Sequence, residues 1–182
     1  IQFESQLEYQ NHAINSIVNI FEGQEICQSN FTVSAMTDNI LTYQNELGIG
    51  NRLELLDDEI LANVQNIQLK NGLPQSQKLN SMDFSVEMET GTGKTYVYIK
   101  TMFELNRKYG FTKFIIVVPS IAIKEGTYKT LEITKEHFKS QFDNVNYDYF
   151  VYDSSNLEQV RDFATSTEIR IMVINIDAFR KS

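Results

Sequence analysis

A short segment near the middle of the chain carries residue types that bind phosphate. Residues 87–95 read Glu-Met-Glu-Thr-Gly-Thr-Gly-Lys-Thr. Gly91 and Gly93 can adopt positive φ angles, which turn backbone N–H groups toward an anion. In such a phosphate loop, Lys94 reaches the β- and γ-phosphates and the Thr95 hydroxyl binds Mg²⁺. We therefore predict a nucleotide site, with Lys94 and Thr95 as its catalytic members, made by Thr90, Gly91, Thr92, Gly93, Lys94 and Thr95.

The loop departs from the usual pattern at one position. Met88 stands six residues before the lysine, where the pattern has glycine. We interpret this residue as a mark of helicase-type loops. The alternative is a glycine-rich turn between a strand and a helix that binds no ligand.

Gln10 is the candidate for choosing the base of the nucleotide. Its amide can donate to and accept from the edge of adenine at the same time. Together with the phosphate loop it predicts ATP as the cofactor. The alternative is an ordinary surface glutamine on an amphipathic helix.

A third candidate site follows the apolar run at 113–118. Pro119 and Ser120 end that run, and Lys124 comes one helical turn later. Ligand loops of open α/β sheets lie at the carboxyl ends of strands, so we predict that Pro119, Ser120 and Lys124 contact a nucleic-acid phosphate. The alternative is that Ser120 only caps a helix.

Hydrolysis of ATP also needs an acid on the metal ion. The acids at 57–59 precede the loop and are better explained as the first turn of a helix, where negative charge is favourable. Asp177 ends an apolar strand, but Ala178 stands where a second acid would help. We expect the metal-binding acid to lie beyond Ser182, in a longer protein.

Helix and strand patterns predict how these residues are positioned. The alternation after residue 80 implies a mainly parallel sheet flanked by helices, so the fold class is α/β. We expect a helical segment at 1–80, carrying Gln10, and the first part of an α/β domain at 81–182. The expected helices are 3–21, 31–47, 55–69, 94–109, 121–139 and 155–164, with a loop at 70–81 and strands at 83–88, 113–118, 147–152 and 168–176.

Composition limits the possible classes of protein. The 182 residues have a net charge of −8, with 42% hydrophobic and 22% charged residues, which is typical of a globular chain. No apolar run approaches the ~18 residues of a membrane helix, so we expect no membrane partner. The acidic total disfavours general polyanion binding, although residues 94–139 carry nine basic and four acidic side chains. The single cysteine, Cys27, indicates a reducing compartment.

Several segments resemble the restriction (Res) subunit of type III restriction-modification enzymes. The resemblance implies a superfamily 2 helicase-like motor with a RecA-like first domain, in which ATP-dependent translocation along duplex DNA is coupled to cleavage. It also implies a modification (methyltransferase) subunit as partner and a location in the bacterial cytoplasm. The segments that carry it are 3–4, 7–10, 20–23, 61–65, 83–95, 113–126 and 173–179.

The resemblance also implies roles for residues. By that likeness Gln10 matches the adenine-reading glutamine, the loop at 91–95 matches motif I, and 119–126 matches the DNA-contacting motif Ia. Family members continue into an acidic box, a second RecA-like domain and a nuclease, so we expect this chain alone to be inactive. The alternatives are another superfamily 2 DNA helicase, a small-molecule phosphotransferase, and a nucleotide-binding module without catalysis of its own.

Overall fold

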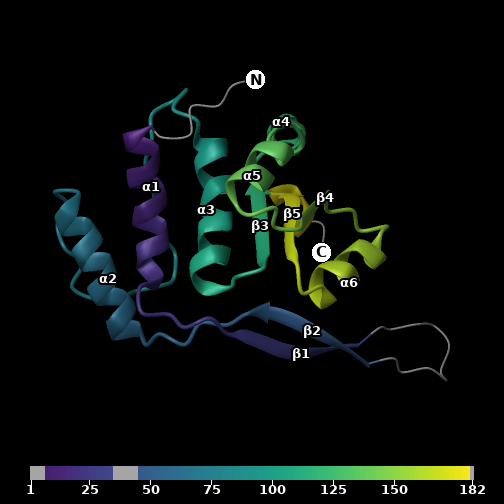
Figure 1. Cartoon of the computed structure of the whole chain (residues 1–182), viewed down its shortest axis with the longest axis horizontal. Coiled ribbons are helices and arrows are strands. Elements are labelled where there is room, and N and C mark those ends of the chain that lie inside the picture. Colours follow the sequence, from purple (N-terminus) through teal and green to yellow (C-terminus); the bar gives the residue numbers. More distant parts are fainter. Residues whose placement is uncertain (1–6, 35–44, 181–182) are drawn as a thin grey trace. The chain divides into compact units, whose positions relative to one another are not determined.

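The computed structural model describes residues 7–34 and 45–180. These residues form two compact units (Figure 1). The first unit combines the described residues up to Ile26 with Leu53–Tyr109. The second combines the described residues of Cys27–Arg52 with those from Gly110 onward.

The first unit is built from helices. The helix α1 is followed directly by the 3-10 turn η1 (Asn19–Phe21). The helices α1 and α3 lie side by side, and the Tyr109 hydroxyl donates to the Val18 carbonyl at 3.0 Å in their buried interface (Figure 1). The helices of this unit are α1 (Glu8–Val18), α2 (Asp57–Lys70) and α3 (Lys94–Tyr109).

The start of α2 explains the acidic run at 57–59. All three carboxylates lie in the first turn of the helix, where the exposed N–H groups favour negative charge. The Glu59 carboxylate also accepts the Leu56 N–H at 2.8 Å, which closes the helix end. The prediction that these acids begin a helix is confirmed.

The predicted strand at 83–88 is wrong. The segment has no strand partner among the described residues, and Phe84 and Val86 are 37% and 42% exposed. The alternation of apolar residues was present, but a strand also requires a neighbouring backbone with which to pair. The segment is therefore an irregular stretch that leads into the phosphate loop.

The second unit contains a parallel sheet in the order β3-β5-β4. Both outer strands run parallel to β5, with Ile116 opposite Val173 and Phe150 opposite Met172. The central strand is the most buried of the three, as expected for a parallel sheet covered on its faces. The prediction of an α/β fold with a parallel sheet is confirmed. The strands are β3 (Lys113–Val118), β4 (Tyr147–Val151) and β5 (Ile169–Asn175).

Helix α4 packs against all three strands of the sheet and contacts α5, and Leu131 of α4 and Phe138 of α5 are completely buried. The predicted single helix at 121–139 is divided at Thr134, whose hydroxyl donates to the Thr130 carbonyl at 2.7 Å. The 3-10 turn η2 (Ile176–Arg180) follows β5. The helices of this unit are α4 (Ile121–Ile133), α5 (Lys135–Gln141) and α6 (Leu157–Thr165).

The predicted helix at 31–47 is also wrong over residues 31–34 and 45–47. The rest of that prediction, residues 35–44, lies outside the described residues. An antiparallel hairpin of β1 (Gln28–Ser34) and β2 (Asn45–Asn51) takes its place. Phe31 lies opposite Gly48, and its ring occupies the space that a side chain on this glycine would need. An aromatic ring across from a strand glycine stabilises such a pair.

No helix in the described parts of the chain is long and apolar enough to cross a bilayer.

Candidate nucleotide-binding site

The phosphate loop has the backbone that its sequence predicts. Gly91 and Gly93 both have positive φ angles, of 83° and 82°. Open space surrounds the position of a Cβ on Gly91. The helix α3 begins at Lys94, directly after the second glycine, and the Val97 N–H bonds to the Gly93 carbonyl at 3.0 Å. A turn with this backbone at a helix N-terminus fits an anionic group such as a phosphate.

Side chains of the loop bond to its own carbonyl groups. The Lys94 amine donates to the carbonyls of Met88 at 2.5 Å and Glu89 at 2.6 Å. The Thr92 hydroxyl donates to the Glu89 carbonyl at 2.7 Å. Lys94 is nevertheless exposed, so its amine can exchange these carbonyls for phosphate oxygens. Thr90 lies in the preceding turn, and Thr95 is a half-buried residue in the first turn of α3.

Gln10 contacts this loop across 82 positions of sequence. Its side-chain nitrogen donates to the Thr92 carbonyl at 2.9 Å, and the residue is only 6% exposed. A Cβ placed on Gly93 would lie 2.7 Å from the same nitrogen. The structure therefore brings together two features that the sequence singled out separately, and it requires a glycine at the contact.

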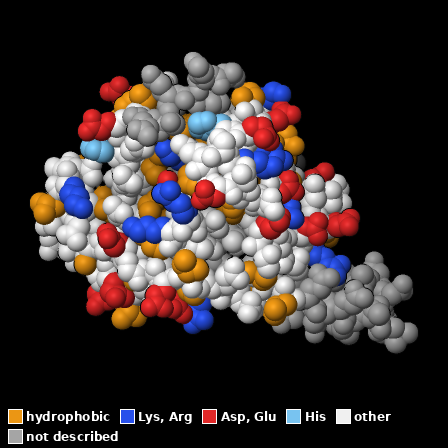
Figure 2. Space-filling model, in the orientation of Figure 1, with side chains coloured by type: hydrophobic (Ala, Val, Ile, Leu, Met, Phe, Trp, Pro, Cys, Tyr) orange, Lys and Arg blue, Asp and Glu red, His pale blue; other side chains and the backbone are white. Residues whose placement is uncertain are grey.

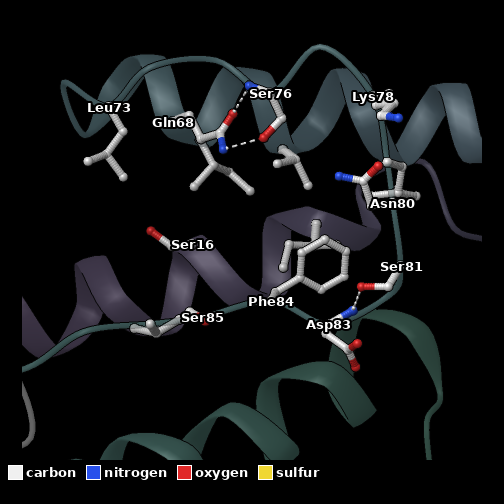
Figure 3. Close-up of a pocket in the computed structure, with 15 residues that line it drawn as sticks. Ser16, Gln68, Leu73, Ser76, Lys78, Asn80, Ser81, Asp83, Phe84 and Ser85 are labelled. Atoms are coloured by element: carbon white, nitrogen blue, oxygen red, sulfur yellow. Dashed lines mark hydrogen bonds between the residues drawn. The ribbon is translucent and has the colours of Figure 1, made fainter.

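A cavity of about 400 Å³ lies elsewhere in the first unit (Figure 3). Side chains of α1, α2 and the segment 73–86 line it. The Gln68 amide forms part of the wall and makes two 2.8 Å hydrogen bonds with Ser76. Neither Gln10 nor the loop at 87–95 contributes to the lining, so this cavity is separate from the phosphate loop.

The candidate DNA-contacting residues lie in the second unit. Ser120 caps α4, since its hydroxyl accepts the Ile123 N–H at 3.3 Å. Pro119 precedes it at the end of β3 and is exposed. The capping role weighed from the sequence is therefore present, and it is compatible with a phosphate contact.

Lys124 lies among acids. Its amine is 3.9 Å from a Glu125 carboxylate oxygen, and its side chain is only 21% exposed. Hydrogen bonds from Ser155 lower the pKa of Asp153, and the charge of Lys124 lowers it further. Acidic and basic side chains are likewise intermixed over the face shown in Figure 2. The positive charge of Lys124 is thus partly balanced by acids.

Asp177 lies in η2, where its N–H bonds to the Asn175 side chain at 2.9 Å. Over residues 7–34 and 45–180, no group of three histidine, cysteine or acidic side chains is arranged to hold a metal ion. Thr95 stays the metal ligand predicted from the sequence.

The parallel sheet flanked by helices, with a glycine loop that opens a helix, defines a RecA-like, helicase-like domain. The chain belongs to the family described as type III restriction enzyme, Res subunit, which matches residues 5–182.

Three proteins similar to this chain are Res subunits of type III restriction-modification enzymes. The Res subunit of the type III restriction-modification enzyme EcoP15I of Escherichia coli is 33% identical over 94% of this chain and 19% of its own length. The EcoPI Res subunit of Escherichia phage P1 is 30% identical over 95% of this chain, again 19% of its own length. The StyLTI Res subunit of Salmonella typhimurium is 50% identical over 64 residues. The chain thus spans about a fifth of the length of the first two relatives.

Proposed function

We propose that this chain is the ATP-binding, N-terminal motor portion of a type III restriction endonuclease. The observation that carries the proposal is the hydrogen bond from the Gln10 amide to the Thr92 carbonyl inside the phosphate loop. It places the amide that we propose to read the base against the backbone that we propose to hold the phosphates.

Different residues of the loop bind different parts of the Mg·ATP complex. The N–H groups of the turn at 90–95 and the start of α3 hold the phosphates. Lys94 leaves the carbonyls of Met88 and Glu89 and bonds to the terminal phosphates. The Thr95 hydroxyl is a ligand for Mg²⁺, which when bound neutralises charge on the β- and γ-phosphates.

In the whole protein, binding of ATP drives movement along duplex DNA and is coupled to cleavage. The relatives' name, restriction-modification enzyme, supports DNA as the substrate and a modification subunit as the partner, in the bacterial cytoplasm. Within this chain, Pro119, Ser120 and Lys124 are the proposed DNA contacts. Because the relatives are about five times longer, we place the metal-binding acid outside this chain.

The domain organisation belongs to the same proposal. The segment at 1–80, which carries α1, α2 and the hairpin of β1 and β2, presents Gln10, and residues 81–182 form the first part of the motor domain. If the chain works alone, it is a nucleotide-binding module, because the groups that orient the attacking water are supplied by the rest of the protein.

Substitution of Gln10 tests the proposal. Gln10→Ala removes the amide that reads the base and leaves the loop residues in place. We expect ATP affinity to fall about tenfold, equivalent to ~1.4 kcal/mol, while GTP affinity stays the same. Calorimetric titration of both nucleotides measures this difference.

The matched control is Gln77→Ala, an exposed glutamine in the loop that follows α2. It should leave both affinities unchanged. Equal affinity of the wild-type chain for ATP and GTP would contradict the proposed role of Gln10.

A further inference from the structure

One buried lysine in the first unit lies close to the Gln10 contact. Lys100 is 7% exposed and is the charged residue in the otherwise mostly apolar buried face of α3. Burial of a cation is costly unless polar groups compensate it. Burial is also the main reason that the pKa of this lysine lies below its usual value.

The amine of Lys100 points to the residue that follows Gln10. It donates to the Asn11 side-chain oxygen at 3.4 Å, and it lies 6.0 Å from the centre of the Tyr96 ring. Asn11 and Gln10 occupy adjacent positions in the first turn of α1. Lys100 is six residues after Lys94 in α3. The hydrogen bond therefore joins the helix that carries Gln10 to the helix that the phosphate loop opens.

This bond joins the two helices near the loop, and two other hydrogen bonds join them at the opposite end. Farther along, Tyr109 bonds to the Val18 carbonyl, and Lys108 lies 3.4 Å from the Asn19 side-chain oxygen. Apolar packing permits small shifts of one helix along another, whereas a hydrogen-bonded pair between a buried lysine and a half-buried asparagine favours one register. Near the loop, the pair of Asn11 and Lys100 sets that register.

We infer that Lys100 and Asn11 are positioning residues for adenine selection, because they hold α1 where the Gln10 amide meets the Thr92 carbonyl. The inference rests on the proposed function of Gln10. Neither residue belongs to the loop at 90–95, so we expect their effect to be confined to the discrimination between bases.

The test compares ATP with GTP in the full chain. Lys100→Met keeps the length and packing of the side chain and removes its donor. Asn11→Ala removes the acceptor at a helix position that favours alanine. We expect each to lower the ratio of the GTP to the ATP dissociation constant by about five- to tenfold. Binding of inorganic tripolyphosphate, which has no base, should not change.

Lys108→Met is the matched control, since it removes the other lysine that bonds from α3 to the residue after α1, far from Gln10. It should keep the wild-type ratio. If Lys100→Met does not fold, Asn11→Ala alone decides the result.

Three results would overturn the inference. If Lys100→Met and Asn11→Ala keep the wild-type ratio while Gln10→Ala lowers it, the positioning role is wrong and the proposed function stands. If tripolyphosphate affinity falls together with ATP affinity, the pair supports the loop in general. If the wild-type chain has no preference for ATP, the inference and the role of Gln10 fail together.

Discussion

Lys94 is held by its own loop before any ligand binds. Its amine bonds to two backbone carbonyls, those of Met88 and Glu89. Binding of phosphate at the loop would replace these neutral acceptors with charged ones. A lysine arranged in this way contributes to the affinity for any nucleoside triphosphate.

Lys94→Ala should therefore weaken ATP and GTP to the same extent. A hydrogen bond to a charged group contributes ~1.5–3 kcal/mol, so we expect each affinity to fall about tenfold or more. Calorimetry measures both, and Lys108→Ala at the far end of α3 serves as the control. Unchanged binding in Lys94→Ala would show that Lys94 does not contact the phosphates.

A second lysine predicts how stability depends on pH. Burial, and to a lesser extent the charge of Arg170, lowers the pKa of Lys113 to about 8. Its amine donates to the carbonyls of Ser166 and Glu168, which lie between α6 and β5. The unfolded chain keeps this proton up to about pH 10.4, so between these values the unfolded state binds more protons. The free energy of unfolding should then rise with pH across this window.

Lys113→Gln should abolish that part of the rise. Chemical denaturation of both proteins at several pH values between about 7 and 10 measures the difference in slope. Lys129→Gln, at an exposed position of α4, should leave the rise in place. An identical slope in wild type and Lys113→Gln would show that the amine keeps its proton.

At the scale of elements, Asn51 joins the hairpin to the sheet. Its side-chain oxygen accepts the N–H groups of Thr112 and Lys113 at 2.8 and 3.0 Å, and its nitrogen donates to the Lys113 carbonyl at 2.8 Å. Three hydrogen bonds from one side chain thus connect the end of β2 to the start of β3.

Asn51→Ala should lower the free energy of unfolding by about 1–3 kcal/mol, because it leaves backbone groups near the buried Thr112 without their partner. Urea denaturation measures this loss. Asn30→Ala, at an exposed position of β1, is the control and should change stability by less than about 0.5 kcal/mol. Equal stability of Asn51→Ala and wild type would show that water replaces these bonds.

Elements with local signals could be predicted from the sequence. The helix predicted at 94–109 has those bounds in the structure, because Gly93 and Gly110, both with positive φ, mark its two ends. The hairpin could not be predicted, since its pairing depends on contacts between residues 11 to 23 positions apart. The segment at 83–88 shows the opposite case, in which an alternating pattern has no partner strand among the described residues.

The candidate site shows the same limit. The sequence of the loop predicted its turn, and Gln10 was singled out by its residue type. Their contact across 82 positions could not be read from either segment. The burial of Lys100 was not predicted, because a lysine in a helix usually lies on the solvated face. The available hint was its position among the apolar residues of α3.

At the scale of the whole molecule, the residues proposed for ATP and for DNA lie in different units. Gln10 and the loop belong to the first unit, and Ser120 and Lys124 to the second. We expect the 182-residue chain to bind nucleotide but to turn over less than about one ATP per second with duplex DNA present, the low end of typical rates. Faster turnover that is lost in Asp177→Asn would identify Asp177 as the metal ligand.

The central claim is that ATP binds at the phosphate loop beside Gln10. Titration of the ¹⁵N-labelled chain with Mg·ATP, followed by NMR, tests it most directly. The account predicts that the largest shifts occur in the backbone amides of residues 91–95 and in the side-chain amide of Gln10. Shifts that cluster instead around Ser16, Gln68 and Phe84, in the separate cavity of the first unit (Figure 3), with the loop unchanged, would contradict it.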